Sequence, residues 1–244
     1  MRLAIISDIH GNVRALDAVL TDIGRAGADA IVCLGDLAAM GPRPGEAVAR
    51  VAALGCPVVQ GNTDDWLLHG LPTPPAGNET AARIRDVNAW CAAALEPAHR
   101  AFLAALPPTV ALDLDGVALL AYHGSPRSHM ENTLPTTPEE TLAEWFAGVD
   151  APLLAGGHTH HQMLRRWQGR TILNPGSVGL TFQRFPTPGI ASPPWAEYAI
   201  VEVAGGGVRV DLRCVPVDLD ALTADVAASG MPHQAWWLRT WWGR

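Results

Sequence analysis

Short apolar runs alternate with helical patterns along the first hundred residues. Runs of consecutive aliphatic residues predict strands at 2–6, 30–34 and 57–60. Over 12–27 and 44–54, apolar residues recur every three or four positions, which is the spacing of an amphipathic helix. Strands that alternate with helices indicate a largely parallel sheet covered by helices on both faces.

The later part of the chain continues both patterns. We expect a mostly helical insertion at about 65–106, with Asn78 as the N-cap of a helix that starts at Glu79. The dipeptide Asp115-Gly116 predicts a hairpin over 109–124. Thr137 is the expected N-cap of a further helix, with Pro138 at its first position. Other strands are predicted at 151–157, 163–167, 171–176, 197–203 and 208–217, before a helix at 218–229.

Nothing in the sequence resembles a linker between two domains. We therefore predict a single domain over 1–244, ending in a tryptophan-rich tail at about 231–244. This tail contains Trp236, Trp237, Trp241 and Trp242. Two interpretations stay open for it: packing onto its own domain, or contact with a second copy in a homodimer.

Polar side chains follow five of the predicted strands, at the point where each strand ends. These side chains are Asp8, His10, Asp36, Asn62, His123, His158 and His160. The carboxyl ends of strands in an open α/β sheet meet at one edge, so we expect these groups to lie close together. Buried carboxylates and imidazoles are costly unless they are paired or neutralised, and divalent cations would neutralise them.

The run "GHTHH" carries the strongest metal signal. Imidazole is a common metal ligand, and alternate residues of an extended chain share a face. His158 and His160 are therefore expected on one side and His161 on the other.

Six short motifs occur in a fixed order: "DIHGN", "GDLAAMGP", "GNTD", "HG", "GHTH" and "NPGSVG". Together they resemble the calcineurin-like metallophosphoesterase superfamily, especially the small bacterial and archaeal phosphodiesterases with "NPGS" after "GHTH". The resemblance runs from Arg2 to about Val217. It implies an α/β (α+β) protein folded as a four-layer αββα sandwich.

The resemblance also implies how the polar residues divide between two metal ions. Asp8, His10 and His160 would hold one ion, Asn62, His123 and His158 the other, and Asp36 would bridge them. Such nitrogen and oxygen ligands suit Mn²⁺, with Fe, Zn²⁺, Ni²⁺ or Co²⁺ as alternatives. A hydroxide bridging the ions would attack phosphorus in line, with Asp36 and Asn62 acting through the metals.

One motif departs from the family pattern. Several relatives carry a histidine, thought to protonate the leaving group, where this chain has Thr63. A threonine hydroxyl is a poor proton donor at neutral pH, so we expect a preference for esters with good leaving groups. Asp64 and His129 are alternative acids, and Arg127 is a candidate contact for a substrate phosphate.

We predict a metal-dependent phosphoesterase, in particular a phosphodiesterase, acting on a phosphorylated small molecule, with nucleotides among the candidates. Two alternatives stay open. One is a dinucleoside polyphosphate hydrolase that cleaves pyrophosphate bonds. The other is a catalytically weak scaffold, because a related retromer subunit uses the same fold for protein interaction. The complete set of seven ligands favours the enzyme.

Composition narrows the partners and the compartment. The net charge of −7 argues against a general nucleic-acid binder. All 17 cationic side chains are arginine, which excludes chemistry that needs a lysine. No apolar stretch is long enough to suggest a membrane span. The four cysteines are scattered and form no CxxC motif, so we expect a cytoplasmic protein.

Overall fold

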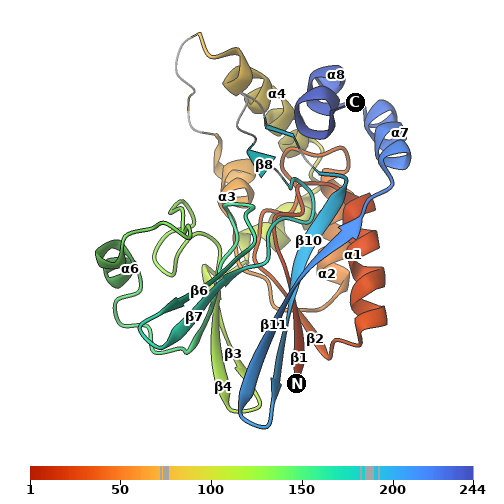
Figure 1. Cartoon of the computed structure of the whole chain (residues 1–244). Coiled ribbons are helices and arrows are strands. Elements are labelled where there is room, and N and C mark those ends of the chain that lie inside the picture. Colours follow the sequence, from red (N-terminus) through yellow and green to blue (C-terminus); the bar gives the residue numbers. More distant parts are fainter. Residues whose placement is uncertain (72, 74–76, 182, 185–189, 192, 244) are drawn as a thin grey trace.

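Two β-sheets stack face to face in the computed structural model (Figure 1). The structure describes residues 1–71, 73, 77–181, 183–184, 190–191 and 193–243. One sheet has the strand order β11-β10-β1-β2, with β1 (Arg2–Ile6), β2 (Ala30–Cys33), β10 (Trp195–Ala204) and β11 (Gly207–Pro216). The other has the order β3-β4-β5-β7-β6, with β3 (Thr109–Leu114), β4 (Val117–Tyr122), β5 (Leu153–Ala155), β6 (Met163–Trp167) and β7 (Arg170–Asn174). A small separate pair contains β8 (Gln183–Arg184) and β9 (Ile190–Ala191).

The helices have the following bounds: α1 (Val13–Ala26), α2 (Pro44–Ala53), α3 (Asn62–His69), α4 (Glu79–Ala93), α5 (Pro97–Ala104), α6 (Glu139–Trp145), α7 (Leu219–Ser229), α8 (Gln234–Trp237) and the π-helical η1 (Leu238–Trp242). Figure 1 shows α1 and α2 to the right of the sheets and α6 to the left. The layers therefore follow the order helix, sheet, sheet, helix, as the sequence predicted.

Alternating side chains of the strands fill the space between the sheets. Leu3 and Ile5 of β1 pack in one cluster with Leu119 and Ala121 of β4 and with Leu153 of β5. Side chains two apart on a strand share a face, so one set from each sheet builds this inner core.

The other face of each sheet packs against helices. Ala4 and Ile6 of β1 belong to a cluster with the buried sides of α1 and α2. On the far side, Leu154 of β5 and Ile172 of β7 pack with Phe146 at the end of α6. Both sheets are therefore covered on both faces.

The sheets are mixed, and the prediction of a largely parallel sheet is wrong. β1 is parallel to β2 but antiparallel to β10, and β10 is antiparallel to β11. In the other sheet, β5 is parallel to both neighbours, while β3 and β6 pair antiparallel at the edges. Hairpins supply three of these antiparallel pairs, β3–β4, β6–β7 and β10–β11. At the β3–β4 turn, Asp115 and Gly116 both have the positive φ expected of that dipeptide.

Two other local predictions also need correction. The segment predicted as a strand at 57–60 makes only an isolated bridge, between Val58 and Cys33. Thr137 is not the N-cap of α6: Pro138 occupies that position, and the Thr137 hydroxyl accepts from the Leu134 N–H at 2.8 Å. The predicted cap at Asn78 is confirmed, because its side chain accepts from the Ala81 N–H.

The tryptophan-rich tail packs onto its own domain. Trp237 is 0% exposed and Trp242 is 5% exposed, and both belong to the helix-covered core. The Trp237 indole N–H donates to the Met40 carbonyl at 2.6 Å. Burial within one chain accounts for these two side chains, and the homodimer stays a prediction.

No helix in the described part of the chain combines the length and apolar character needed to cross a bilayer.

Candidate metal centre

The seven candidate ligands lie in loops at the carboxyl ends of the strands and at the start of α3. Asp8 and His10 follow β1, Asp36 follows β2, Asn62 begins α3, His123 follows β4, and His158 and His160 follow β5. Six of them are buried and His158 is half-buried. The two sheets thus bring residues from distant parts of the sequence to one place.

The first group consists of Asp8, His10 and His160. Nε2 of His10 lies 3.1 Å from Nε2 of His160. Oδ1 of Asp8 lies 3.1 Å from Nε2 of His160 and 3.8 Å from Nε2 of His10. These three ligand atoms all lie within 4.8 Å of one another, which is close enough to share one cation.

The second group is built around His123. Its Nε2 lies 3.0 Å from Oδ1 of Asn62 and 3.5 Å from Oδ2 of Asp36. The same Oδ2 lies 3.7 Å from Nε2 of His10, so the Asp36 carboxylate faces both groups. The His158 ring packs edge-on against His123, with ring centroids 5.2 Å apart.

Hydrogen bonds fix which ring nitrogen of three histidines carries a proton. Nδ1 of His10, His160 and His123 lies 3.1, 2.5 and 2.7 Å from the carbonyls of Ala39, Leu180 and Leu34, respectively. A carbonyl only accepts, so Nδ1 donates and Nε2 of each neutral ring presents a lone pair. A partner of this kind on the second nitrogen is typical of a metal-binding histidine.

The space between these ligand atoms suits a cation. The Nε2 atoms of His10 and His160 face each other, and Oδ1 of Asp8 has no hydrogen bond of good geometry within the described residues. Three electron-pair donors that point at one another repel unless a positive charge lies between them. A mixture of carboxylate, imidazole and amide ligands suits Mn²⁺ and similar divalent ions.

The pKa values reflect the same electrostatics. Burial acts to raise the pKa of Asp8, but the imidazoles of His160 and His10 beside its carboxylate hold that pKa well below its ordinary value. Asp36 is likewise held low beside His123, against the effect of burial. Burial acts to lower the pKa of His123, yet the Asp36 charge raises it to about 10. Two ionised carboxylates therefore attract positive charge into the cluster.

Most of the candidate ligands adopt a left-handed backbone. Asp8, His10, Asp36, His158 and His160 have φ between 47° and 66°. This conformation costs about 1 kcal/mol or more for a residue with a side chain, and such strain concentrates at functional sites. His158 and His160 reach the cluster in this way, so the prediction of an extended chain there is wrong.

The sequence profile of the calcineurin-like phosphoesterase superfamily domain matches residues 1–205. The chain belongs to this superfamily. A metallophosphoesterase from Sphaerobacter thermophilus has a similar crystal structure, with 32% identity and a TM-score of 0.74 over 98% of each chain. A hypothetical protein from Pyrococcus horikoshii shares the fold with 18% identity and a TM-score of 0.78, covering 100% of this chain and 98% of its own. An uncharacterised protein from Methanocaldococcus jannaschii is 30% identical over 184 residues, which are 73% of this chain and 70% of that protein.

Thr63 lies in the pocket beside the cluster. His10, Asp36 and Asn62 also line this pocket. The Thr63 N–H donates to Oδ1 of Asp36 at 2.8 Å. Its buried hydroxyl has no hydrogen-bond partner within the described residues, so it is free to bind a ligand in the pocket.

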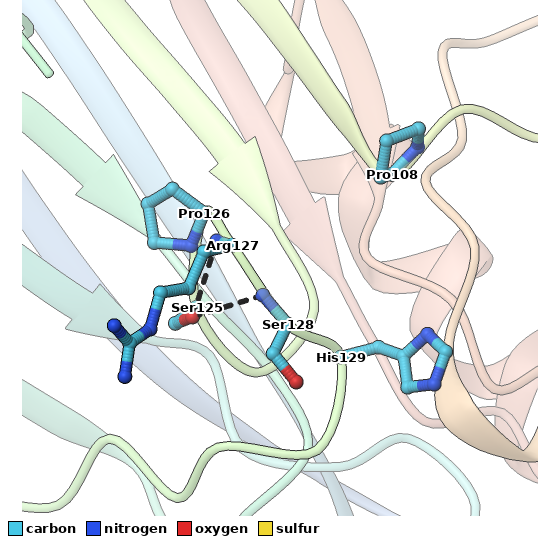
Figure 2. Close-up of a pocket in the computed structure, with 6 residues that line it drawn as sticks. All are labelled: Pro108, Ser125, Pro126, Arg127, Ser128 and His129. Carbon is cyan, nitrogen blue, oxygen red and sulfur yellow. Dashed lines mark hydrogen bonds between the residues drawn. The ribbon is translucent and has the colours of Figure 1, made fainter. Parts of the chain in front are cut away.

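His129 and Arg127 line a different pocket, together with Pro108 and neighbouring loop residues (Figure 2). Figure 2 shows their side chains pointing in opposite directions. The Arg127 guanidinium pairs with Glu131 at 2.7 Å and with Glu144 at 2.8 Å. A phosphate contact by Arg127 would require it to leave these carboxylates, so the geometry does not favour that prediction.

Asp64 supports the loop that carries Asp36, a role that the sequence analysis missed. Oδ2 of Asp64 accepts from the backbone N–H of Asp36 at 2.8 Å and of Gly61 at 3.0 Å, and Oδ1 accepts from Leu37 at 2.8 Å. Asp64 is 0% exposed and does not line the pocket beside the cluster, so the geometry does not favour its prediction as an acid for the leaving group. The signal for the observed role is an acidic residue at the third position of a helix, where it can cap backbone N–H groups.

The motif "NPGSVG" supports the ligand loops through their backbone. The Asn174 side chain donates to the Gly157 carbonyl at 2.6 Å and to the Thr159 hydroxyl at 3.1 Å. The Ser177 hydroxyl donates to the Asp8 carbonyl at 2.9 Å. These bonds hold the strained turns beside Asp8 and His158.

Proposed function

We propose that this protein is a metal-dependent phosphodiesterase that uses two divalent cations, with Mn²⁺ as the first candidate. The observation that carries the proposal is the convergence of ligand atoms of Asp8, His10 and His160, which all lie within 4.8 Å of one another. Superfamily membership supplies the reaction class, the hydrolysis of phosphate esters.

The proposed ligand sets are those expected from the sequence. Asp8, His10 and His160 would hold one ion, and Asn62, His123 and His158 the other. Asp36 is proposed as the bridge because its Oδ2 faces both His10 and His123. When bound, the two cations would supply Lewis-acid activation of water and neutralisation of phosphate charge.

The protein's own residues would orient the reactants. Hydrogen bonds to backbone carbonyls keep the three Nδ1 atoms protonated and their Nε2 lone pairs aimed into the cluster. The free Thr63 hydroxyl is a candidate donor to the leaving group or to a phosphate oxygen. Because it transfers protons poorly, we propose that aryl esters react faster than alkyl esters.

The proposed substrate is a phosphorylated small molecule, with nucleotides among the candidates. A net charge of −7 disfavours general binding of nucleic acid. The four free cysteine thiols are compatible with the reducing cytoplasm, which we propose as the compartment.

The test is hydrolysis of bis-p-nitrophenyl phosphate by metal-stripped protein during titration with Mn²⁺. We expect metal-dependent turnover that falls at least about a hundredfold in Asp36→Asn, because this change removes a charge that faces both groups. Asp150→Asn, an exposed carboxylate before β5, is the control and should keep full activity. Turnover that is unaffected by removing the metal, or by Asp36→Asn, would contradict the proposal.

A further inference from the structure

The pocket beside the candidate centre is largely apolar away from the metal-ligand candidates. Its volume is about 170 Å³. Its polar lining consists of five metal-ligand candidates together with Thr63 and Asn88. Its apolar lining consists of Met40, Trp66, Ile84, Leu180 and Trp241. Inorganic phosphate is polar on all sides, so two indole rings and three other apolar side chains indicate a ligand with an apolar part.

Distant segments supply this apolar lining. Trp66 comes from α3, Ile84 from α4 and Trp241 from η1 near the end of the chain. Figure 1 shows α3, α4 and α8, which leads into η1, gathered at the same end of the sandwich. The C-terminal tail therefore completes the pocket as well as packing onto the domain.

The size of the pocket limits what it can accept. A cavity of about 150 Å³ lined by apolar side chains is known to bind benzene, so a pocket of 170 Å³ has room for about one aromatic ring. Indole rings stack well on flat π-systems, which favours an aromatic group over an aliphatic chain of equal volume.

One amide lies among the apolar residues. Asn88 is 2% exposed, and its side-chain oxygen accepts from the Met40 N–H at 3.0 Å. Its NH₂ group has no hydrogen-bond partner within the described residues, although Asn88 lines the pocket. A few polar groups in an apolar pocket fix the orientation of a ligand, and this one suits an acceptor atom on the edge of a ring.

We propose that Trp66 and Trp241 form a subsite for a planar aromatic group of the substrate, so that the natural substrate is a phosphate ester with an aromatic ring close to the phosphorus. This inference rests on the proposed function, because the phosphoryl group is assigned to the adjoining metal centre. The metal centre binds the phosphoryl group, and the two indole rings stack on the aromatic ring of the substrate.

Two stable phosphonates test the subsite without any contribution from leaving-group chemistry. Phenylphosphonate and methylphosphonate carry the same charged group, and neither is hydrolysed at the carbon–phosphorus bond by an esterase. Calorimetry with Mn²⁺-loaded protein measures the dissociation constant of each. We expect phenylphosphonate to bind about tenfold or more tightly than methylphosphonate, because burying a ring contributes that much affinity.

Substitutions of the two tryptophans test whether the ratio of the two dissociation constants depends on the indole rings. In Trp241→Ala and in Trp66→Ala, the affinity ratio should fall at least about threefold, and Trp241→Phe should restore part of it. Trp236→Ala is the matched control, since Trp236 belongs to the same tail but does not line the pocket. Its ratio should equal that of the unsubstituted protein. Circular dichroism identifies any variant that fails to fold, and the other tryptophan then serves as the test.

The outcomes separate this inference from the proposed function. Equal binding of both phosphonates, or a ratio that survives both Trp66→Ala and Trp241→Ala, would overturn the aromatic subsite and leave the phosphoesterase proposal standing. If neither phosphonate binds and no ester is hydrolysed, the proposed function fails and the subsite with it. A tenfold ratio that depends on the two indoles supports both.

Discussion

Asp64 shows how one buried carboxylate can hold a candidate active-site loop. It accepts three backbone N–H groups, two of them from Asp36 and Leu37 in the loop after β2 and one from Gly61 before α3. Gly61 also packs directly against Asp36, and a Cβ at that position would collide with the Asp36 carboxylate. The loop and the helix are therefore tied together in a way that sets the position of Asp36.

Replacing Asp64 with asparagine should destabilise the protein. The asparagine would replace one accepting carboxylate oxygen with an NH₂ group, which cannot accept from a backbone N–H. At least one buried N–H would lose its acceptor, at a cost of about 2 kcal/mol. Urea unfolding of metal-stripped protein measures the change. Asp65→Asn is the matched control. The Asp65 side chain is partly exposed and, in the described structure, bonds only to His69, so its replacement should cost less than about 1 kcal/mol. Equal effects of the two substitutions would argue against the proposed role of Asp64.

At the scale of elements, two helices, α4 and α8, support the same loop. Met40, which follows Asp36 by four residues, has a left-handed backbone with φ of 67°. Its N–H donates to the Asn88 side chain on α4, and its carbonyl accepts from the Trp237 indole on α8. Two elements from separate parts of the chain thus hold a strained residue that lines the pocket.

Trp237→Ala should be strongly destabilising. The substitution empties a fully buried site and leaves the Met40 carbonyl without its donor, so we expect a loss of about 3 kcal/mol or more in the free energy of unfolding. Trp236→Ala makes the same chemical change on a half-buried neighbour and should cost clearly less. Chemical denaturation followed by circular dichroism compares the two. If their midpoints coincided, the tail would not be an integral part of the fold.

At the scale of the whole molecule, the stacked sheets bury carboxylates beside imidazoles, and this links stability to pH. The Asp36 charge raises the pKa of His123 to about 10, against an ordinary value of 6.5. The folded state therefore binds this proton more tightly than the unfolded chain does. The resulting stability is fully present below about pH 6.5 and is lost as the pH rises toward about 10.

We expect the metal-free protein to lose stability between pH 7 and pH 9, by up to about 1 kcal/mol per pH unit from this group. Urea unfolding at several pH values, with His123→Gln as the comparison, isolates the contribution. The unsubstituted protein should show the steeper decline. Mn²⁺ should make the free energy of unfolding of this protein depend less on pH, because a bound cation would replace the proton as the partner of Asp36. Parallel profiles for the two metal-free proteins would contradict the assignment.

Much of the fold and of the candidate site follows from local sequence patterns. Short aliphatic runs locate most strands and period-3.6 repeats locate the long helices, and the turn at Asp115 and the cap at Asn78 follow from their chemistry. The polar residues after each strand point to one edge of the sheets, because carboxyl ends of neighbouring strands converge there. These features depend on residues close together in the chain, which is why the sequence alone determined them.

Other features were decided only by the tertiary structure. The mixed sheets depend on which strands meet after collapse, and the left-handed turns at His158 and His160 are held by contacts with distant loops. The support role of Asp64 and the place of Trp241 in the pocket also arise from contacts between separate segments. Such contacts depend on how whole layers pack, and the free energy of that packing is shared among many residues, so no local stretch of sequence specifies it.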